Sequence, residues 1–238
     1  MTVTVPTVTP PIAESATRSV LASAANTGVD LRPLLAAYAR HDPPRSIAVI
    51  GNAPLTPNPD RAAAIDDADL VIRMTTFALD EPGAEPVFGT RTDVVVLHRG
   101  TLPSPYTFAD YTSRLYLHIE PGRMHWEPDF RPYWWPEDLG QVHIPNYQIS
   151  LPLVRLLGLD PAQATWATTG TTSVYLATTL FPDADVRIAG FSLLRDTEQE
   201  VFEHAWGGSV QVTAEHRLKA ESALLHTWAA EGRITILP

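Results

Sequence analysis

The chain of 238 residues contains no cysteine. This absence excludes disulfide bonds, thiolate metal ligands and a cysteine nucleophile. A chain without cysteine suits a reducing compartment, so we expect the protein to be cytoplasmic.

Long apolar runs are also missing. No stretch approaches the ~20 consecutive apolar residues of a membrane-spanning helix, so we expect no membrane partner. The first residues, MTVTVPTVTPPIAES, have neither the basic start nor the apolar segment of a secretory signal. Their Thr, Val and Pro content predicts a flexible N-terminal arm over residues 1–15, and we expect residues 16–238 to form a single domain.

Positive charge is scarce. The chain has 17 Lys and Arg residues against 27 Asp and Glu residues, which gives a formal net charge of −10. An acidic surface argues against nucleic acid as a partner, although a single pocket can still be positive.

Several common site motifs are absent. No histidines show HxxxH or HExxH spacing, and GxGxxG, GxxxxGK[ST] and GxSxG are not found. Two Asp-x-Asp pairs, Asp67/Asp69 and Asp183/Asp185, each precede a predicted strand. Ligands of an open α/β sheet bind beyond the opposite, carboxyl ends of its strands. We therefore interpret both pairs as turns or caps, and we expect no metal.

The sequence does contain a regular alternation of strand and helix patterns. Short apolar, β-branched runs predict buried parallel strands at 46–51, 70–74, 93–97, 114–118, 141–144, 185–189 and 234–237. Helical patterns lie at 28–40 (with Asp30 as a candidate N-cap), 60–68, 148–158, 170–181 and 216–232. We expect an α/β fold, a single Rossmann-like domain with a mostly parallel sheet flanked by helices.

Two junctions between predicted elements can bind a ligand. Gly51 and Asn52 follow the first strand, where a glycine lets a ligand approach and an amide both donates and accepts; a plain turn is the alternative. Thr168, Thr169 and Gly170 lie at the start of a helix, where hydroxyl and N–H groups suit a phosphate or carboxylate. Simple N-capping by threonine is compatible with that role.

Two histidines near the C-terminus, His204 and His216, are candidates for proton transfer, because histidine titrates near neutral pH. A surface position is the alternative for each. Glu221 follows His216 by five positions, about 140° around an ideal helix, which argues against direct pairing of the two side chains. We expect Glu221 to act through a facing strand or to cap a neighbouring element.

An irregular stretch carries many aromatic side chains. It forms either a substrate wall or lid, or a satellite hydrophobic cluster beneath a long loop, and both interpretations stay open. The residues are Tyr106, Phe108, Tyr111, Trp126, Phe130, Tyr133, Trp134 and Trp135.

Several stretches, taken in order, resemble the four sialylmotifs of the eukaryotic-type sialyltransferase family. The large motif is similar to SIAVIGNAP (46–54), IDDADLVIRM (65–74) and FGTRTD (88–93). The small motif resembles ATTGTTSVYLATTLFPDADVRIAGF (167–191). The third resembles His204-Ala-Trp206, and the very small motif, His-x4-Glu, is matched by His216 and Glu221.

The resemblance implies a variant of the glycosyltransferase A-type fold. It also implies an inverting, metal-independent transfer of a sugar from a CMP-activated donor, which is a co-substrate and not a cofactor, to an acceptor hydroxyl. It makes His216 the general base and lets His204 stabilise the leaving phosphate. The residues that it assigns to donor binding are Gly51, Asn52, Thr75, Thr168, Thr169 and Gly170, and those that it makes structural are Arg73 and Glu221.

Two positions depart from the family pattern, since Thr75 stands where the family has asparagine and Thr168 where serine is usual. The donor sugar is therefore open between sialic acid and another sugar acid. Two other functions stay open as well. One is a hydrolase on the same scaffold that cleaves a CMP-linked or nucleotide glycosidic bond, and the other is a non-catalytic nucleotide-binding module.

Overall fold

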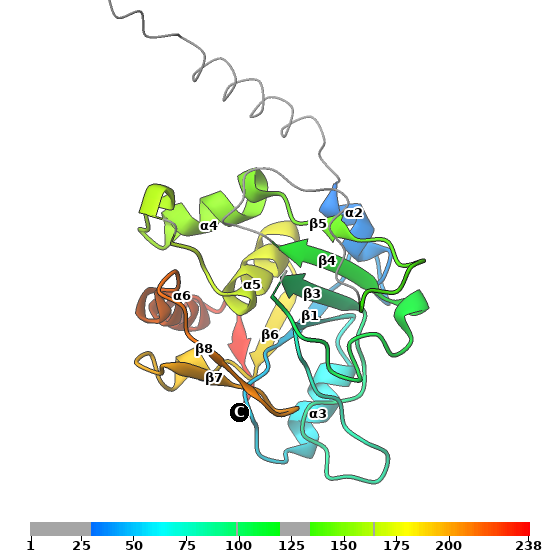
Figure 1. Cartoon of the computed structure of the whole chain (residues 1–238). Helices are drawn as coiled ribbons and strands as arrows, with labels where there is room; N and C mark the ends of the chain where they lie inside the picture. The colour runs from blue at the N-terminus through cyan, green and yellow to red at the C-terminus, as the bar shows by residue number, and fades with distance from the viewer. Residues whose placement is uncertain (1–29, 99, 120–133, 164) are drawn as a thin grey trace, which may run out of the picture.

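The computed structural model describes residues 30–98, 100–119, 134–163 and 165–238. The expected N-terminal arm, residues 1–15, lies outside this part, as do Trp126, Phe130 and Tyr133. Figure 1 shows a central sheet with helices packed against it.

The strands of the described chain follow the alternation that the sequence predicts. They are β1 (Ser46–Ile50), β2 (Leu70–Met74), β3 (Val94–His98), β4 (Leu115–Ile119), β5 (Val142–His143), β6 (Asp185–Ala189), β7 (Val201–Glu203), β8 (Ser209–Gln211) and β9 (Thr235–Ile236). The helices are α2 (Leu31–Ala36), α3 (Pro59–Asp66), α4 (Leu151–Leu156), α5 (Thr169–Leu180) and α6 (Leu218–Ala230). Short 3-10 or π turns lie at η1 (Tyr111–Ser113), η2 (Asn146–Ser150), η3 (Pro161–Gln163) and η4 (Ser192–Leu194).

Seven strands form one sheet in the order β5-β4-β3-β2-β1-β6-β9. Each neighbouring pair runs parallel; Val49 of β1, for example, lies in register with Ile72 of β2 and Ile188 of β6. The predicted α/β fold with a mostly parallel sheet is confirmed. The strand order reverses at β1, with β2 to β5 on one side and β6 and β9 on the other. In an open α/β sheet, a ligand crevice forms beyond the carboxyl ends of the strands at such a reversal.

Alternating side chains of the strands feed a core on each face of the sheet. On one face, Val49 and Ile72 belong to a cluster with Leu35 of α2, Val174 of α5 and Leu225 of α6. On the other face, a smaller cluster joins α3 to β1 and β2 through Ile65, Ile50 and Val71. Both faces are covered, as a parallel sheet of apolar strands requires.

The described aromatic residues of the irregular stretch pack together beside β3 and β4. Phe108 stacks on Tyr116 with ring centroids 5.5 Å apart, and Trp135 meets both rings edge-on at 5.5 and 5.8 Å. Trp134 joins the same cluster. For these residues the structure favours the satellite hydrophobic cluster over a substrate wall.

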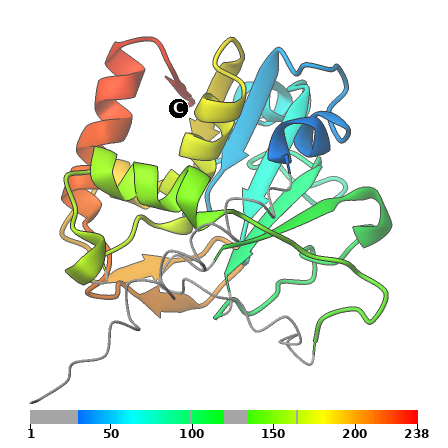
Figure 2. The same cartoon turned by 90° about the horizontal axis from the view of Figure 1, so that it is seen from above.

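Three local features differ from the sequence prediction. The helix predicted at 28–40 is α2, which begins after the predicted cap Asp30 but ends at Ala36, because the Arg40 N–H bonds to the Asp69 carbonyl at 2.9 Å. The helix predicted at 148–158 is a π turn followed by the short α4. The third feature, an antiparallel hairpin of β7 and β8, was not predicted, since three-residue strands leave no periodic signal. Figure 2 shows this hairpin apart from the main sheet.

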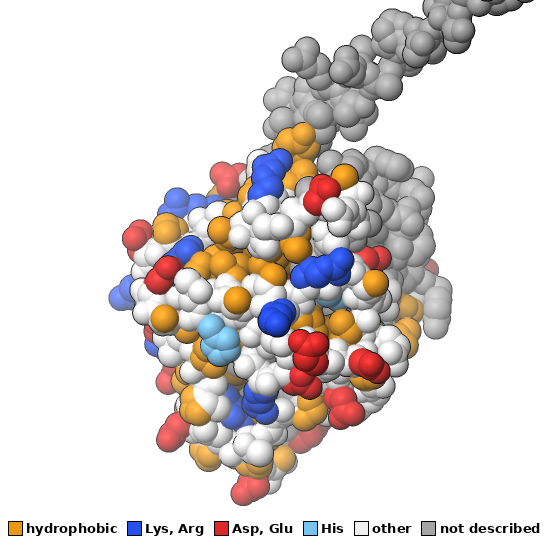
Figure 3. Space-filling view, turned by 90° about the vertical axis from the view of Figure 1, so that its left-hand side faces the viewer, with side chains coloured by type: hydrophobic (Ala, Val, Ile, Leu, Met, Phe, Trp, Pro, Cys, Tyr) orange, Lys and Arg blue, Asp and Glu red, His pale blue; other side chains and the backbone are white. Residues whose placement is uncertain are grey.

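The outer surface over α4 and α6 carries Lys and Arg side chains interspersed with Asp and Glu, and this face shows no continuous basic patch (Figure 3). Within the described ranges, no helix is long and apolar enough to cross a membrane.

Candidate functional site

A cavity of about 590 Å³ opens beyond the carboxyl ends of β1, β2, β3 and β6, at the reversal of strand order. Its volume is within the range of small-molecule sites. Residues from several separate stretches of the chain line it. Among them are all eight that the motif comparison assigns to binding or catalysis: Gly51, Asn52, Thr75, Thr168, Thr169, Gly170, His204 and His216.

The floor of the cavity is a close contact between two strand ends. The Gly51 N–H donates to the Ala189 carbonyl at 2.8 Å, and a Cβ on Gly51 would lie 2.2 Å from the Gly190 carbonyl oxygen. Gly190 has φ of 74°, in the left-handed region that favours glycine. The packing of β1 against β6 therefore already requires glycine at position 51, before any approach of a ligand is considered.

Asn52 connects the large-motif strand to two other parts of the site. Its side-chain NH2 group donates to the Thr75 hydroxyl. Its main-chain carbonyl accepts a 2.7 Å hydrogen bond from the Ala205 N–H in the hairpin. The buried Oδ1 of Asn52 has no hydrogen-bond partner among the described residues. An amide with an unused acceptor beside a cavity is suited to a polar ligand.

Thr75 is held in an uncommon conformation. Its φ is 52°, although threonine is β-branched and rarely adopts the left-handed region. The Thr75 N–H donates to the Val96 carbonyl at 2.9 Å, which ties the residue to β3. The surrounding sheet maintains this strained backbone at the cavity wall.

His204 follows β7 directly and lies at the turn of the hairpin, where its carbonyl accepts from the Gly207 N–H at 2.9 Å. The contact between Ala205 and Asn52 brings His204 beside the end of β1. Burial lowers the pKa of His204. At the hairpin tip, Trp206 packs edge-on against Tyr106 with ring centroids 5.4 Å apart.

His216 is oriented by a main-chain carbonyl. Its Nδ1 lies 3.0 Å from the main-chain oxygen of Trp166. Its ring packs edge-on against the ring of Phe202, with ring centroids 6.3 Å apart. Because a carbonyl oxygen only accepts, Nδ1 carries the proton of the neutral ring. The lone pair is then on Nε2, which makes no hydrogen bond to a described residue and is available to take a proton.

Glu221 lies next to the cavity wall but does not line the cavity. It is fully buried in the first turn of α6, and its Oε2 accepts from the Thr168 N–H at 2.9 Å and the Thr168 hydroxyl at 2.7 Å. Thr168 in turn caps α5 by accepting from the Thr171 N–H. Glu221 therefore holds Thr168, the N-cap residue of α5.

The five-residue spacing of His216 and Glu221 lets the two side chains reach different residues of the same segment. The two side chains do not bond to each other; they reach Trp166 and Thr168, two residues apart on one extended segment. Since this segment leads into α5, the pair fixes the N–H groups of Thr169 and Gly170 at the cavity. Those N–H groups have no partner within the helix, because they belong to its first turn.

Arg73 has no place in the cavity. Its side chain is fully buried, and its Nε and Nη2 donate to the carbonyls of Arg91 at 2.9 Å and Phe88 at 2.7 Å. Burial lowers its pKa to about 10, so the guanidinium stays charged at neutral pH. The structural role expected for Arg73 is therefore that of an anchor for the loop before β3.

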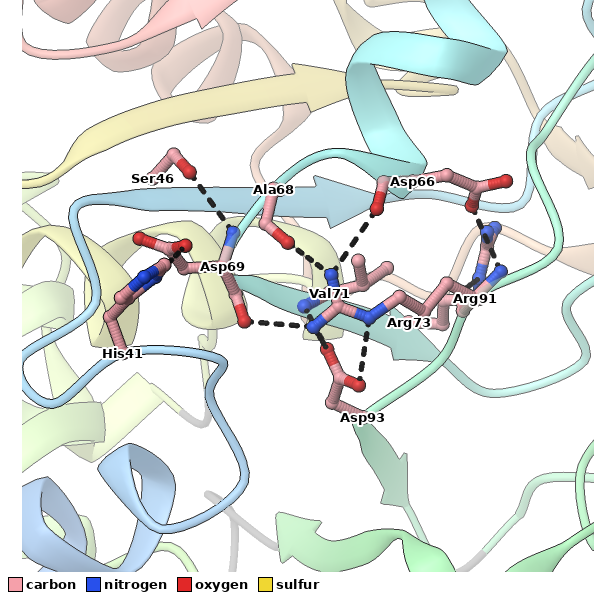
Figure 4. A network of polar contacts seen from close by, with 9 residues as sticks. All are labelled: His41, Ser46, Asp66, Ala68, Asp69, Val71, Arg73, Arg91 and Asp93. Carbon is pink, nitrogen blue, oxygen red and sulfur yellow. Dashed lines mark hydrogen bonds and ion pairs between the residues drawn. The ribbon is translucent and has the colours of Figure 1, made fainter.

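The two Asp-x-Asp pairs lie at the amino edge of the sheet, as expected for turns and caps. Asp69 accepts from the Arg45 N–H at 2.8 Å. It also contacts His41 at 2.6 Å, as Figure 4 shows. Asp185 forms an ion pair with Arg187 at 2.7 Å. No group of three His, Cys, Asp or Glu side chains among the described residues could hold a metal ion.

The charge of the cavity is unusual. Its described lining includes Glu203 and Glu215 but neither Lys nor Arg. The described lining groups that can favour an anion are therefore the histidines and the N-terminus of α5, whose helix dipole attracts negative charge.

Sequence reasoning missed part of the lining: Trp166, Gly190, Phe191, Ser192 and, above all, His98. His98 is the last residue of β3. The rule that ligands bind at the carboxyl ends of strands, applied to the predicted strand 93–97 as it was to 46–51, would have identified this residue.

Comparisons with known proteins support the fold. No family model matches the sequence, and no curated protein matches it. Two solved structures, however, share the fold. A mammalian sialyltransferase superposes with a TM-score of 0.54 at 18% identity, over 81% of this chain and 68% of that chain. A mammalian sialyltransferase in complex with Gal-beta-1-3GalNAc-ortho-nitrophenol gives a TM-score of 0.53 at 18% identity, over 81% and 69%.

Proposed function

We propose that the protein is a sialyltransferase-like glycosyltransferase. It transfers a sugar, sialic acid or another sugar acid, from a CMP-activated donor to an acceptor hydroxyl, with inversion and without a metal. Its partners are the nucleotide sugar and an acceptor of undefined structure. The observation that carries the proposal is His216, whose Nδ1 is bonded to the Trp166 carbonyl so that Nε2 serves as a base in the cavity.

A second set of groups in the cavity, at the start of α5 and at Asn52, binds the donor. The N–H groups at the start of α5, with the hydroxyl of Thr169, suit the phosphate or carboxylate of the donor. The unused Oδ1 of Asn52 accepts from the nucleotide. The described lining of the cavity includes neither Lys nor Arg, so these groups carry the recognition of the anionic donor there.

The reaction follows from this arrangement. Nε2 of His216 takes the proton of the acceptor hydroxyl as its oxygen attacks the anomeric carbon of the donor. The bond from that carbon to the phosphate oxygen breaks, and CMP leaves with the electron pair. His204 and the N-terminus of α5 stabilise the negative charge on the phosphate, which is the role that a metal fills in other transferases. Attack opposite the leaving group inverts the anomeric configuration.

Calorimetric binding of CMP, UMP, GMP and AMP tests the donor class. We expect CMP to bind at least ten times more tightly than the other three. Equal affinities, or no binding at all, would overturn the proposal, because the donor site would then have no preference for cytidine.

Incubation with CMP-sialic acid tests the reaction. We expect slow release of CMP from the donor alone and a faster release when a mixture of glycan acceptors is added, with the same rates in the presence of EDTA. Fast release that acceptors do not change would instead support the hydrolase, with water as the nucleophile. Binding of CMP without any turnover would support the non-catalytic module.

A further inference from the structure

A third histidine shares the cavity with His204 and His216. His98 ends β3 and contributes to the cavity lining, facing the hairpin and the start of α6. None of the four motifs includes it.

The loop after β3 holds the His98 ring in one orientation. The Gly100 N–H donates to Nδ1 of His98 at 3.1 Å, and Thr101 bonds to the His98 main chain through its N–H at 3.0 Å and its Oγ1 at 3.3 Å. The ring also packs on Gly100, where an added Cβ would lie 3.3 Å from Cε1. Thr101 is itself buried, which anchors the loop.

This contact decides the tautomer of His98. A main-chain N–H only donates, so Nδ1 of His98 must offer its lone pair, and the neutral ring carries its proton on Nε2. His216 has the opposite tautomer, because its Nδ1 faces a carbonyl. The same cavity therefore contains one histidine that presents an acceptor and another that presents a donor.

The environment keeps His98 neutral. Burial, followed by the charges of His216 and His204, lowers the pKa of His98. Among the residues that the structure describes, none accepts a hydrogen bond from Nε2. His98 is half-buried and lines the cavity, so this N–H is suited to an acceptor brought by the ligand.

We propose that His98 is a ligand-contacting residue that donates a hydrogen bond from Nε2–H to an anionic oxygen of the bound nucleotide sugar. The inference rests on the proposed function. The described lining of the cavity offers an anionic ligand neither Lys nor Arg, so donors have to come from other groups, and His98 adds one to those at the N-terminus of α5. The acceptor on the ligand is either a phosphate oxygen or the carboxylate of the sugar.

Two substitutions distinguish the loss of the Nε2–H donor from the loss of the ring. His98→Phe keeps the ring volume and removes both nitrogens, whereas His98→Gln places an amide N–H near the former Nε2. We expect His98→Phe to weaken binding of the anionic ligand about 10- to 100-fold, the range for a hydrogen bond to a charged group. His98→Gln should retain most of the affinity, and His226→Phe, an exposed histidine on α6, should change nothing.

Calorimetry with two probes identifies the oxygen. If His98 contacts the phosphate, His98→Phe weakens binding of CMP itself. If it contacts the carboxylate, CMP binds normally and only CMP-sialic acid loses affinity. Unchanged affinity for both probes, in a variant whose circular dichroism matches the wild type, overturns the inference. Failure of the wild type to bind CMP is a different result, because it removes the proposed function first.

Nitrogen-15 NMR of the wild-type histidines tests the geometry without any ligand. At pH 7.5 we expect the His98 ring to show a protonated Nε2 and an unprotonated Nδ1, and the His216 ring to show the reverse. The same tautomer on both rings would contradict the assignment.

Discussion

The two edges of the parallel sheet carry different polar side chains, with carboxylates and arginine at the amino edge and asparagine, threonine and histidine at the carboxyl edge. At the amino edge, the carboxylates are occupied by the protein itself. Asp93 accepts from the Val71 N–H at 2.7 Å and pairs with Arg91 at 2.7 Å (Figure 4). Asp66 accepts from the Thr90 N–H at 2.9 Å. At the carboxyl edge, polar groups have unused capacity.

That unused capacity is specific. Oδ1 of Asn52 has no partner among the described residues, and Nε2 of both His98 and His216 makes no hydrogen bond to one. Nη1 of Arg73 and Oγ1 of Thr92 also lack a partner among the described residues. What separates site from scaffold is therefore that Asn52, His98 and His216 line the cavity as well. Motif membership alone does not make that separation, because Arg73 and Asn52 belong to the same motif and serve different edges.

The largest expected effect concerns the base at the carboxyl edge. His216→Gln should lower the rate of transfer by about 10²–10⁴-fold, as expected when a general base is lost, and leave CMP affinity within a few-fold. Single-turnover kinetics with CMP-sialic acid and an acceptor would measure this, with the exposed His226→Gln as the control. A variant that turns over at the wild-type rate would remove His216 from the reaction.

The next effect concerns the interior anchor. Arg73→Met should lower the free energy of unfolding by about 2–4 kcal/mol, because it leaves the buried carbonyls of Arg91 and Phe88 without donors. CMP affinity should not change in the folded protein. Urea unfolding measures the loss, and Arg155→Met, at an exposed position, should stay within about 0.5 kcal/mol of wild type. A large loss of affinity with normal stability would place Arg73 in the site instead.

A smaller effect concerns backbone strain at the cavity. Thr75→Asn should raise the free energy of unfolding by about 1 kcal/mol, since asparagine tolerates the left-handed region better than a β-branched residue. Asp110→Asn provides the comparison, because Asp110 also has a positive φ, of 54°, but already suits it. Thermal unfolding measures the change in stability of both variants. A Thr75→Asn protein less stable than the wild type would show that the contacts of threonine outweigh the backbone strain.

The smallest effect is a dependence of stability on pH. Burial lowers the folded-state pKa of His98 and His204 below the ordinary value of 6.5. For each histidine, at a pH between its lowered folded-state pKa and its ordinary pKa, the unfolded chain binds a proton that the folded chain does not. Stability therefore falls as the pH is lowered from about 7 toward 5. The double variant His98→Gln, His204→Gln should lose less stability over that range in urea unfolding. An equal or larger loss would refute the assigned direction.

The regular elements follow directly from local sequence. The strands 70–74 and 185–189 have the predicted bounds, because continuous apolar runs in a buried parallel sheet need no partner information to be recognised. Asp30 caps α2 as its side-chain type predicts. The amino-edge positions of Asp69 and Asp185 follow from their places just before β2 and at the first residue of β6.

What the sequence by itself determined is therefore the alternation of elements, and with it the edge at which a ligand binds and the motif residues that gather there. Tertiary structure alone decided the rest. The β7–β8 hairpin, the contact of Gly51 with Gly190 and the reach of Glu221 to Thr168 each depend on chain segments far apart in sequence. The opposite tautomers of His98 and His216 depend on a main-chain N–H and a main-chain carbonyl, which every residue type supplies, so only their positions in space distinguish the two rings.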